Sequence, residues 1–261
     1  MRDLSKLVGR RYAPVVSDHI GPSTAPKRVL IIGGSGGIGA NVARELASGD
    51  RELVLHGRSP TARLEQLTSE LRRRGSTVHS ITRPIETAED GLVVLSEAGP
   101  IDLLVVAFGP YREEGIPGAT PESFRSLMEL NYVLPAALIA GVLPGMIERN
   151  YGRILVFGTT FGDRLVGFKK SAGYAAAKTA LASLVKSTAR QTADVNVRCN
   201  MICPGYVVTC YHDEDTAARY AARMPAGRAQ SAKSIATVAR WLLGEENEAV
   251  NGAIVTADTG L

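Results

Sequence analysis

The chain has 261 residues, of which 45% are hydrophobic and 21% are charged, and its formal net charge is +4. This composition is typical of a globular protein with a large core, and a mild, scattered positive charge argues against a nucleic-acid partner. The three cysteines form no CxxC pair, which favours a reducing compartment and no metal site. No apolar run approaches the roughly eighteen residues of a membrane span, so we expect a soluble, cytoplasmic protein without a membrane partner.

Residues 1–26 differ in character from the rest of the chain. They carry scattered basic side chains and three prolines without any periodic pattern. We therefore expect an N-terminal arm over 1–26, held against the body or a neighbouring subunit, followed by a single domain over 27–261.

A glycine-rich turn follows the first predicted strand, residues 28–32, and precedes a helix. Glycine lets the backbone approach a ligand closely, and the free N–H groups of a helix start favour phosphate. A plain structural turn is the alternative, but the order of strand, turn and helix favours a dinucleotide cofactor. The candidate cofactor residues here are Gly33, Ser35, Gly36, Gly37, Ile38 and Gly39.

The second predicted strand, residues 52–56, ends before Arg58 and Ser59. In dinucleotide-binding folds an acidic residue at this strand end selects NAD, whereas a basic one accommodates the additional phosphate of NADP. The acid is missing here, so Arg58 and Ser59 predict an NADP(H) site. His56 is expected to be a packing residue of the strand end.

Helices and apolar strands continue to alternate along the chain. This alternation predicts an α/β fold with a doubly wound, Rossmann-like parallel sheet of about seven strands and helices on both faces, with ligands at the carboxyl ends of the strands. The further strands are expected at 77–81, 101–107, 152–157, 195–202 and 253–257, and the helices at 61–74, 86–97, from 120 into the 140s, at 174–192 and at 231–243.

The helix that begins after Thr120 contains Pro135. Proline has no N–H to donate to the carbonyl four residues earlier, which belongs to Asn131. The free carbonyl would accept a bond from a bound water, and that water would be able to pass protons. A simple helix kink is an equal alternative on this evidence.

Tyr174 and Lys178 enclose three alanines, which are strong helix formers. The four-residue spacing places the phenol and the ammonium one turn apart on one helix face. A nearby cation favours the phenolate, so we expect Lys178 to lower the pKa of Tyr174 and to make it a usable acid and base. A chance pair on a solvated face is the alternative.

Two further segments carry candidate polar groups. Thr159 and Thr160 end the strand predicted at 152–157, where a hydroxyl would be able to bind a substrate carbonyl. The acidic stretch 212–215 lies in a segment rich in small and charged residues. Consecutive residues do not converge on one metal ion, so we expect a lid in this segment rather than a metal site.

Together these motifs resemble the short-chain dehydrogenase/reductase family in its one-domain form. The resemblance covers about residues 27–261 and rests on the glycine turn, the Asn131 helix, Gly158-Thr159, Tyr174-xxx-Lys178, Pro204-Gly205 and Val250-Asn251-Gly252. It implies that Tyr174 is the general acid/base and that Lys178 lowers its pKa and holds the nicotinamide ribose. It also implies that Thr159 binds the substrate carbonyl and that Asn131 anchors the water of a proton relay.

The resemblance implies a homotetramer that uses the Asn131 and Tyr174 helices and the last strand as interfaces. It also implies further cofactor contacts after the fourth and sixth strands, from Ala107, Phe108, Gly109, Pro204, Gly205, Val207 and Thr209.

The chain departs from the family pattern at several places. Thr159 stands where serine is usual, and Ile32 stands where a threonine normally opens the glycine turn. Residues 106–109 replace an Asn-Asn-Ala-Gly stretch whose amides brace that turn. The region 83–85 replaces an aspartate that is expected near adenine.

The sequence thus predicts an NADP(H)-dependent oxidoreductase that acts on a small-molecule carbonyl or secondary alcohol. A 3-oxoacyl thioester is the alternative substrate class, because the chain is similar to 3-oxoacyl-carrier-protein reductases and Arg153 suits an acidic carrier protein. A non-catalytic dinucleotide-sensing or scaffold protein with the same fold is the alternative of a different class.

Overall fold

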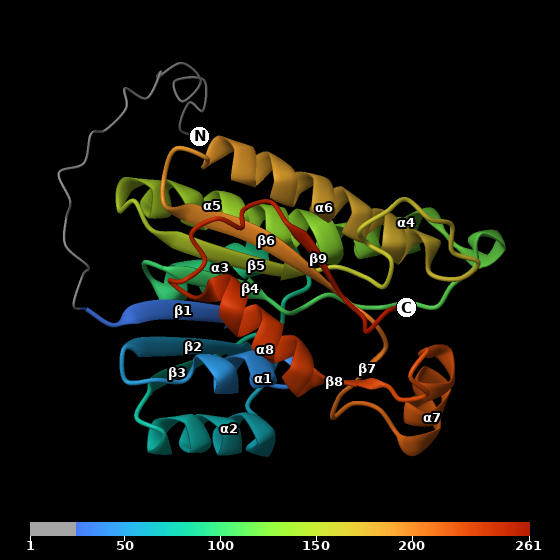
Figure 1. The fold of residues 1–261 in the computed structure, drawn as a ribbon, viewed down its shortest axis with the longest axis horizontal. Helices are drawn as coiled ribbons and strands as arrows, with labels where there is room; N and C mark the ends of the chain where they lie inside the picture. Colours follow the sequence, from blue (N-terminus) through green and yellow to red (C-terminus); the bar gives the residue numbers. More distant parts are fainter. Residues whose placement is uncertain (1–24) are drawn as a thin grey trace.

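The fold is built on one seven-stranded sheet in which every neighbouring pair of strands is parallel. The computed structural model describes residues 25–261, so the arm expected at 1–26 lies outside the described residues except for its last two. The strand order is β3-β2-β1-β4-β5-β6-β9 (Figure 1), which confirms the predicted doubly wound sheet. The strands are β1 Lys27–Ile32, β2 Arg51–Gly57, β3 Thr77–Thr82, β4 Leu103–Val106, β5 Gly152–Phe157, β6 Val197–Pro204 and β9 Ile254–Ala257, and a separate pair is formed by β7 Val207–Val208 and β8 Gln230–Ser231.

Helices cover both faces of this sheet. Figure 1 shows α1, α2 and α8 on one face and α3, α5 and α6 on the other, while α7 stands at the edge where the strands end. The helices are α1 Gly37–Leu46, α2 Ala62–Arg73, α3 Ala88–Ala98, α4 Pro121–Met128, α5 Leu134–Glu148, α6 Ala172–Gln191, α7 Glu214–Arg223 and α8 Ala232–Leu243, with a short 3-10 turn at Ile116–Gly118 and a π-helical turn at Glu129–Val133.

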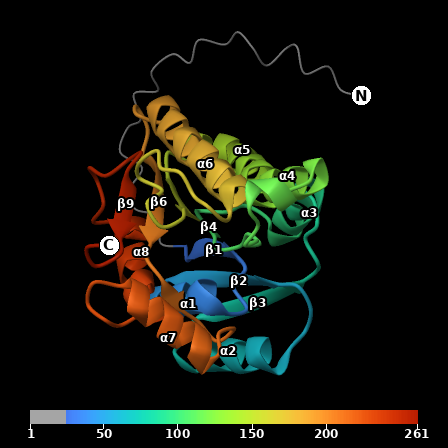
Figure 2. The ribbon, with the colours of Figure 1, turned by 90° about the vertical axis from the view of Figure 1, so that its right-hand side faces the viewer.

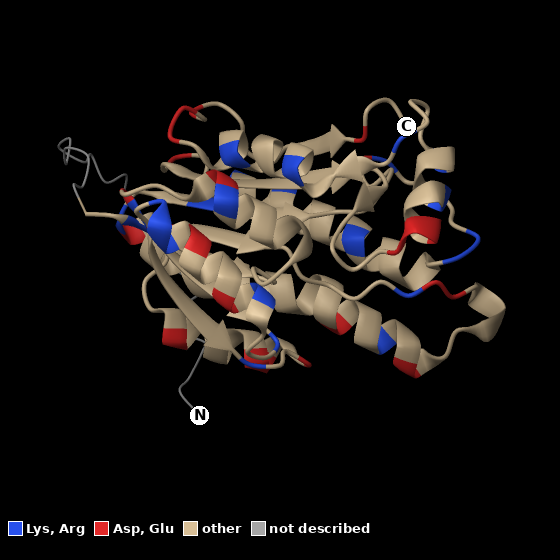
Figure 3. Cartoon of the chain, turned by 90° about the horizontal axis from the view of Figure 1, so that it is seen from below, with Lys and Arg blue, Asp and Glu red and all other residues tan. Residues whose placement is uncertain are grey.

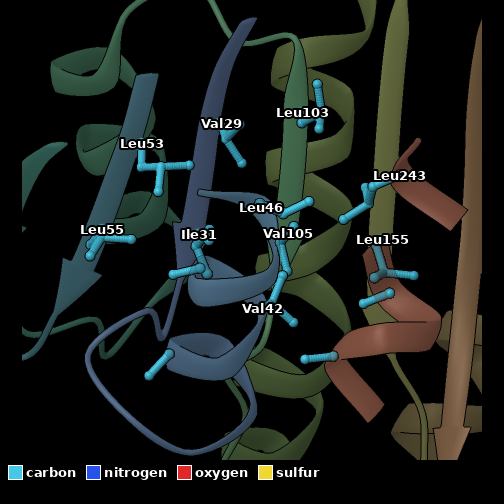
Figure 4. Packing of buried hydrophobic residues seen from close by; sticks show 14 of the residues in the cluster. Val29, Ile31, Val42, Leu46, Leu53, Leu55, Leu103, Val105, Leu155 and Leu243 are labelled. Atoms are coloured by element: carbon cyan, nitrogen blue, oxygen red, sulfur yellow. The ribbon is translucent and has the colours of Figure 1, made fainter. Parts of the chain in front are cut away.

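Successive side chains of each central strand pack into two separate cores, because side chains alternate between the faces of a sheet. Val29 and Ile31 of β1 pack with Val42 and Leu46 of α1 on one face (Figure 4). Leu30 and the other alternate residues of β1 pack beneath α3, α5 and α6 on the other face. Strands buried on both faces read as continuous apolar runs, which is why they were predictable from the sequence.

The direction of winding reverses between β1 and β4. Strands β1, β2 and β3 run outward to one edge, and the chain then returns across β1 to place β4 on its other side. The loops after β1 and β4 therefore leave the sheet side by side at its carboxyl edge, the side that faces the viewer in Figure 2. A switch point of this kind is where open α/β sheets bind ligands.

Charged residues of both signs are interspersed along the helices in the view of Figure 3. Several of them pair between neighbouring elements, such as Arg44 of α1 with Glu70 of α2 at 3.0 Å and Arg83 with Glu97 of α3 at 2.9 Å. These pairs are part-exposed, and pairs of this kind contribute little to stability.

The π-helical turn joins α4 and α5 into one continuous helical segment, Pro121–Glu148, of 28 residues. A window within it has a mean hydropathy of 1.7, so by length and composition alone this segment is able to span a membrane. The sequence-based statement that no such run exists is therefore wrong. Core helices of soluble proteins pass the same test, and 39% of this window is buried in the structure.

The glycine turn allows α1 to pack directly on the turn before it. A Cβ on Gly39 would lie 2.9 Å from the carbonyl carbon of Gly33 and 3.2 Å from the Cβ of Ala107. Because the carbonyl carbon belongs to the backbone, it cannot move aside cheaply.

We expect Gly39→Ala to lower the free energy of unfolding by about 1–3 kcal/mol through this overpacking. Gly118→Ala is the control, since a Cβ there meets no atom within 4 Å. Urea unfolding of both variants measures the difference, and equal stabilities would show that the packing is not tight.

Candidate active site

The glycine turn between β1 and α1 presents bare backbone at the carboxyl edge of the sheet. Gly33 and Gly37 have φ values of 79° and 53°, which glycine adopts without strain. Gly36 is the N-cap of α1, and no side chain caps the helix start. Such a start, with N–H groups and the positive end of the helix dipole, suits a phosphate.

His56 braces this turn from β2. Its Nδ1 accepts a hydrogen bond from the Gly33 N–H at 3.4 Å, and its Nε2 bonds to the carbonyl of Arg83 at 2.8 Å. Burial lowers the pKa of His56, so the ring is neutral and able to accept from Gly33. His56 is therefore more than the packing residue that the sequence suggested, and it supports a turn that lacks the usual threonine and amides.

Tyr211, between β7 and α7, lies over the glycine turn. A Cβ on Gly36 would lie 2.8 Å from the phenolic carbon Cζ of Tyr211. The same ring lies 5.1 Å from the guanidinium carbon of Arg63 in α2. Thr209 also reaches this turn, since its Cγ2 lies 3.7 Å from the Cβ position of Gly37. The structure thus brings Thr209 to the turn, and it adds Tyr211, which the sequence did not single out.

Arg58 lies beyond the end of β2, close to the same turn. Its side chain is 82% exposed, and its nearest carboxylate is Glu86 at 3.9 Å. A Cβ on Gly57 would lie 3.0 Å from the Cβ of Ser35, so the glycine turn packs directly on the strand end that carries Arg58 and Ser59. The residues predicted to bind the cofactor phosphates therefore lie next to those predicted to bind the adenine ribose.

Asn131 lies on the π-helical turn and is fully buried. The backbone N–H of Leu134 bonds to the carbonyl of Glu129, five residues earlier, so the helix widens at Asn131 rather than simply kinking. The side-chain Nδ2 donates to the carbonyl of Pro110 at 3.0 Å, whereas the buried Oδ1 has no hydrogen-bond partner among the described residues. An unsatisfied buried acceptor of this kind marks a position for a ligand or a water.

Tyr174 and Lys178 project from the first two turns of α6 toward Asn131. The Nζ of Lys178 lies 5.6 Å from the ring centroid of Tyr174. It also lies 3.3 Å from the Cβ position of Gly109, and the Cγ of Asn131 lies 3.2 Å from the same position. A side chain at 109 would separate the amide from the amine, so Gly109 allows the predicted catalytic residues to come together.

The ionisation of this pair differs from the prediction. Burial raises the pKa of Tyr174, and the neighbouring phenols and the Cys203 thiol raise it further. Burial also lowers the pKa of Lys178 to about 8. The structure thus shows no lowering of the pKa of Tyr174 by Lys178, and the loss of water around the phenol is the main cause of the raised value.

Thr159 lies at the end of β5, next to this pair. Thr160 donates its hydroxyl to the carbonyl of Pro204 at 3.3 Å, whereas no hydrogen bond occupies the hydroxyl of Thr159 within residues 25–261. The buried thiol of Cys203 lies near both the end of β5 and Tyr174. Its sulfur lies 2.5 Å from the Cβ position of Gly158, and it is close enough to Tyr174 to raise the phenol's pKa. The sequence did not identify Cys203 as part of this site.

The segment after β6 also lies at the carboxyl edge of the sheet. The N–H of Gly205 donates to the side chain of Gln230 at 2.9 Å, and Val207 is buried in β7. The backbone N–H of Thr209 donates to the imidazole of His212 at 3.1 Å. Asp213 caps α7 by accepting from the Thr216 N–H at 2.8 Å, so the acidic stretch forms a helix start.

Most of the predicted residues thus gather along one edge of the sheet, but several have side chains that pack in a core. Ile38, Ala107 and Val207 pack in or against one core, and Phe108 packs against the other. Arg153 is 2% exposed and donates to the carbonyl of Asn196 at 3.1 Å. The expectation that Arg153 attracts an acidic carrier protein is wrong, because its guanidinium is occupied inside the protein.

Comparisons with known proteins agree with this geometry. The family model for short chain dehydrogenase matches residues 27–219. The chain is 27% identical to D-beta-hydroxybutyrate dehydrogenase of Rhizobium meliloti (strain 1021), over 90% of this chain and 98% of that protein. It is also 27% identical to the 3-oxoacyl-[acyl-carrier-protein] reductase FabG of Escherichia coli (strain K12), over 90% of this chain and 97% of that protein.

A solved structure is similar over the same range. The 3-oxoacyl (acyl-carrier-protein) reductase of Agrobacterium tumefaciens C58, with NADP bound, superposes with a TM-score of 0.82 at 25% identity and covers 91% of this chain and 95% of its own. The matching family model, which spans most of the described residues, and the parallel sheet with its glycine turn lead to one conclusion: the chain belongs to the short-chain dehydrogenase family.

Proposed function

We propose that this protein is a cytoplasmic NADP(H)-dependent oxidoreductase that interconverts a small-molecule ketone and its secondary alcohol, with Tyr174 as the general acid/base. The observation that carries the proposal is the position of the Lys178 amine, which lies 5.6 Å from the ring centroid of Tyr174 and shares the space at Gly109 with the amide of Asn131, whose buried Oδ1 is unsatisfied. Family membership supports the reaction class, and the dehydrogenases and reductases among the relatives act on varied substrates.

The raised pKa of Tyr174 gives this residue a definite starting state. A phenol that holds its proton at neutral pH is ready to donate it to a carbonyl oxygen. The free hydroxyl of Thr159 is the proposed donor that orients this oxygen. NADPH, when bound, supplies the hydride. After this donation, a proton from solvent is proposed to return to Tyr174 through the Lys178 ammonium and a water that donates a hydrogen bond to the Oδ1 of Asn131.

The choice of NADP over NAD rests on Arg58. Its side chain is exposed and has only a distant carboxylate neighbour, so it is free to pair with a phosphate on the adenine ribose. The Agrobacterium tumefaciens structure, which contains NADP, supports this choice. A 3-oxoacyl thioester remains the alternative substrate class because of the reductases among the relatives, but the burial of Arg153 removes one argument for a carrier protein.

We also propose a homotetramer that uses α5 and α6. Helix α5 is apolar around its circumference, with buried residues such as Leu138 on one side and the 38% exposed Val133 at its start. A helix that is apolar on all sides is normally covered on all sides, and a second copy of the chain would cover the outer side.

We expect Tyr174→Phe to lower kcat by about 100-fold to 10,000-fold, because the variant has no proton to donate while its ring still fills the site. NADPH binding should be unchanged. Stopped-flow NADPH consumption and fluorescence titration measure the two quantities. Unchanged turnover would refute the role of Tyr174, and NADPH binding without turnover of any ketone by the unmodified protein would favour the non-catalytic alternative.

We expect Lys178→Met to raise the free energy of unfolding by about 3 kcal/mol near pH 7, since a lysine with a folded-state pKa of about 8 and an ordinary value of 10.5 opposes folding while it is protonated. The cost of burying the Lys178 ammonium is complete below the folded-state pKa and decreases as the pH rises toward the ordinary pKa. Near pH 9.5 the stability gained by Lys178→Met should therefore fall to less than half of its value at pH 7.

Thermal unfolding at these two pH values measures the effect of Lys178→Met. Lys186→Met, on the exposed face of the same helix, is the matched control and should change little. A destabilised Lys178→Met protein at both pH values would show that the ammonium is better solvated than its burial indicates.

We expect Arg58→Ala to raise the Kd for NADPH by about 10-fold to 100-fold, because a hydrogen bond to a charged phosphate is lost. The Kd for NADH should not change. Arg74→Ala, at the exposed end of α2, is the control. Equal changes in the Kd values of NADPH and NADH would show that Arg58 does not bind the phosphate on the adenine ribose.

A further inference from the structure

Five rings from three separate parts of the chain, one of them the proposed acid/base itself, form two contacting groups, and we call them the aromatic cluster. Tyr174 comes from α6, one tyrosine comes from the loop after β4, and the others come from the segment that begins after β6 and includes α7. The members of the aromatic cluster are Tyr111, Tyr174, Tyr206, His212 and Tyr220.

Tyr111 lies directly against Tyr174. The two ring centroids are 5.3 Å apart and the planes meet at 85°, an edge-to-face contact. Aromatic pairs favour this arrangement. Tyr111 is nevertheless 60% exposed, so its ring reaches Tyr174 from the solvent side and not from within the core.

Tyr220 of α7 contacts two further rings of the aromatic cluster. Its ring centroid is 5.2 Å from that of Tyr206 and 5.2 Å from that of His212. Burial raises the pKa of Tyr220, and the phenol of Tyr111, from a different segment, raises it further. Tyr220 also raises the pKa of Tyr174.

The segments that carry these rings are held together. Lys170 pairs with Glu113 at 2.9 Å, and the N–H of Ser171 donates to the carbonyl of Glu114 at 2.9 Å. The loop that carries Tyr111 is thereby joined to the start of α6. On the other side, the guanidinium carbon of Arg223 lies 5.4 Å from the ring centroid of Tyr206 and helps to hold α7.

We propose that the substrate of this enzyme carries an aromatic ring close to its reacting carbonyl carbon, and that Tyr111 and Tyr220 hold this ring beside Tyr174. The proposal rests on the proposed function, since it names the substrate class of the same site. Tyr111 and Tyr174 already make an edge-to-face contact, and an aromatic ring of the substrate is proposed to make contacts of the same kind with the aromatic cluster. The two phenol hydroxyls provide polar partners for a ring substituent.

A purely structural role would place these rings in the interior. Instead, Tyr111 is mostly exposed, and Tyr206, His212 and Tyr220 are only partly buried. These partly exposed rings leave surface that a ring of the substrate would cover. Saturated chains are able to fill the same space, but they lack the ring edges and faces that favour aromatic pairs.

The first experiment compares two ketones that share the same carbonyl environment, benzylacetone and its cyclohexyl analogue, on the unmodified protein. Calorimetric titration into the NADP+-loaded protein gives the ratio of Kd values without any chemistry, and NADPH consumption gives the ratio of kcat/KM values. We expect the aromatic ketone to be favoured about tenfold in both, from about two aromatic contacts. The N-acetylcysteamine thioester of acetoacetate should have a lower kcat/KM than benzylacetone.

The second experiment tests which rings produce the preference. Tyr111→Ala and Tyr220→Ala should each reduce the ratio of Kd values by about threefold, whereas Tyr111→Phe and Tyr220→Phe, which keep the rings, should retain it. Ile116→Ala removes a 65% exposed apolar side chain from the same loop as Tyr111 and should leave the ratio unchanged. Thermal unfolding confirms that each variant is folded.

The outcomes separate this proposal from the proposed function. Turnover of ketones without an aromatic preference, a preference that survives the loss of both rings, or a faster reaction with the thioester would overturn the substrate class alone. Absence of turnover with every ketone and with the thioester would overturn the proposed function, and the substrate class would fall with it.

Discussion

The burial of the Lys178 ammonium is the constraint on which the rest of the site depends. Lys178 is 4% exposed, and its pKa falls to about 8 because little water remains around it. The glycine at 109 allows Asn131 and the amine to approach the same space, and the π-helical turn directs Asn131 into it. The protein thus keeps a polar group in a position that opposes folding, which is typical of functional sites.

Much of the fold was predictable from the sequence, because the relevant signals are local. Continuous apolar runs identified the central strands, and the glycines between β1 and α1 identified the turn at the switch point. The same local signals placed Tyr174 and Lys178 on one helix face, which the structure bears out. Proline at 135 correctly marked an irregular helix at Asn131, although the form of the irregularity is a wider turn.

The remaining features depend on contacts between distant segments, which no local pattern contains. The pKa of Tyr174 was predicted in the wrong direction, because it is raised by burial and by the phenols of Tyr111 and Tyr220, which come from segments distant in the sequence. Arg153 was interpreted as a surface residue, because nothing in the adjacent sequence indicates that its guanidinium would donate to the distant Asn196. The roles of His56 and Cys203 likewise follow from pairing of β2 with β1 and of β6 with β5.

The position of Tyr211 over the glycine turn has a consequence for the energetics of ligand capture. A phosphate that approaches Gly36 competes with a phenol of the protein itself, which also rests against Arg63. The observed affinity is then the intrinsic affinity multiplied by the fraction of molecules in which the phenol has swung away. Occupancy of the turn by the proposed phosphate is therefore an exchange between two partners.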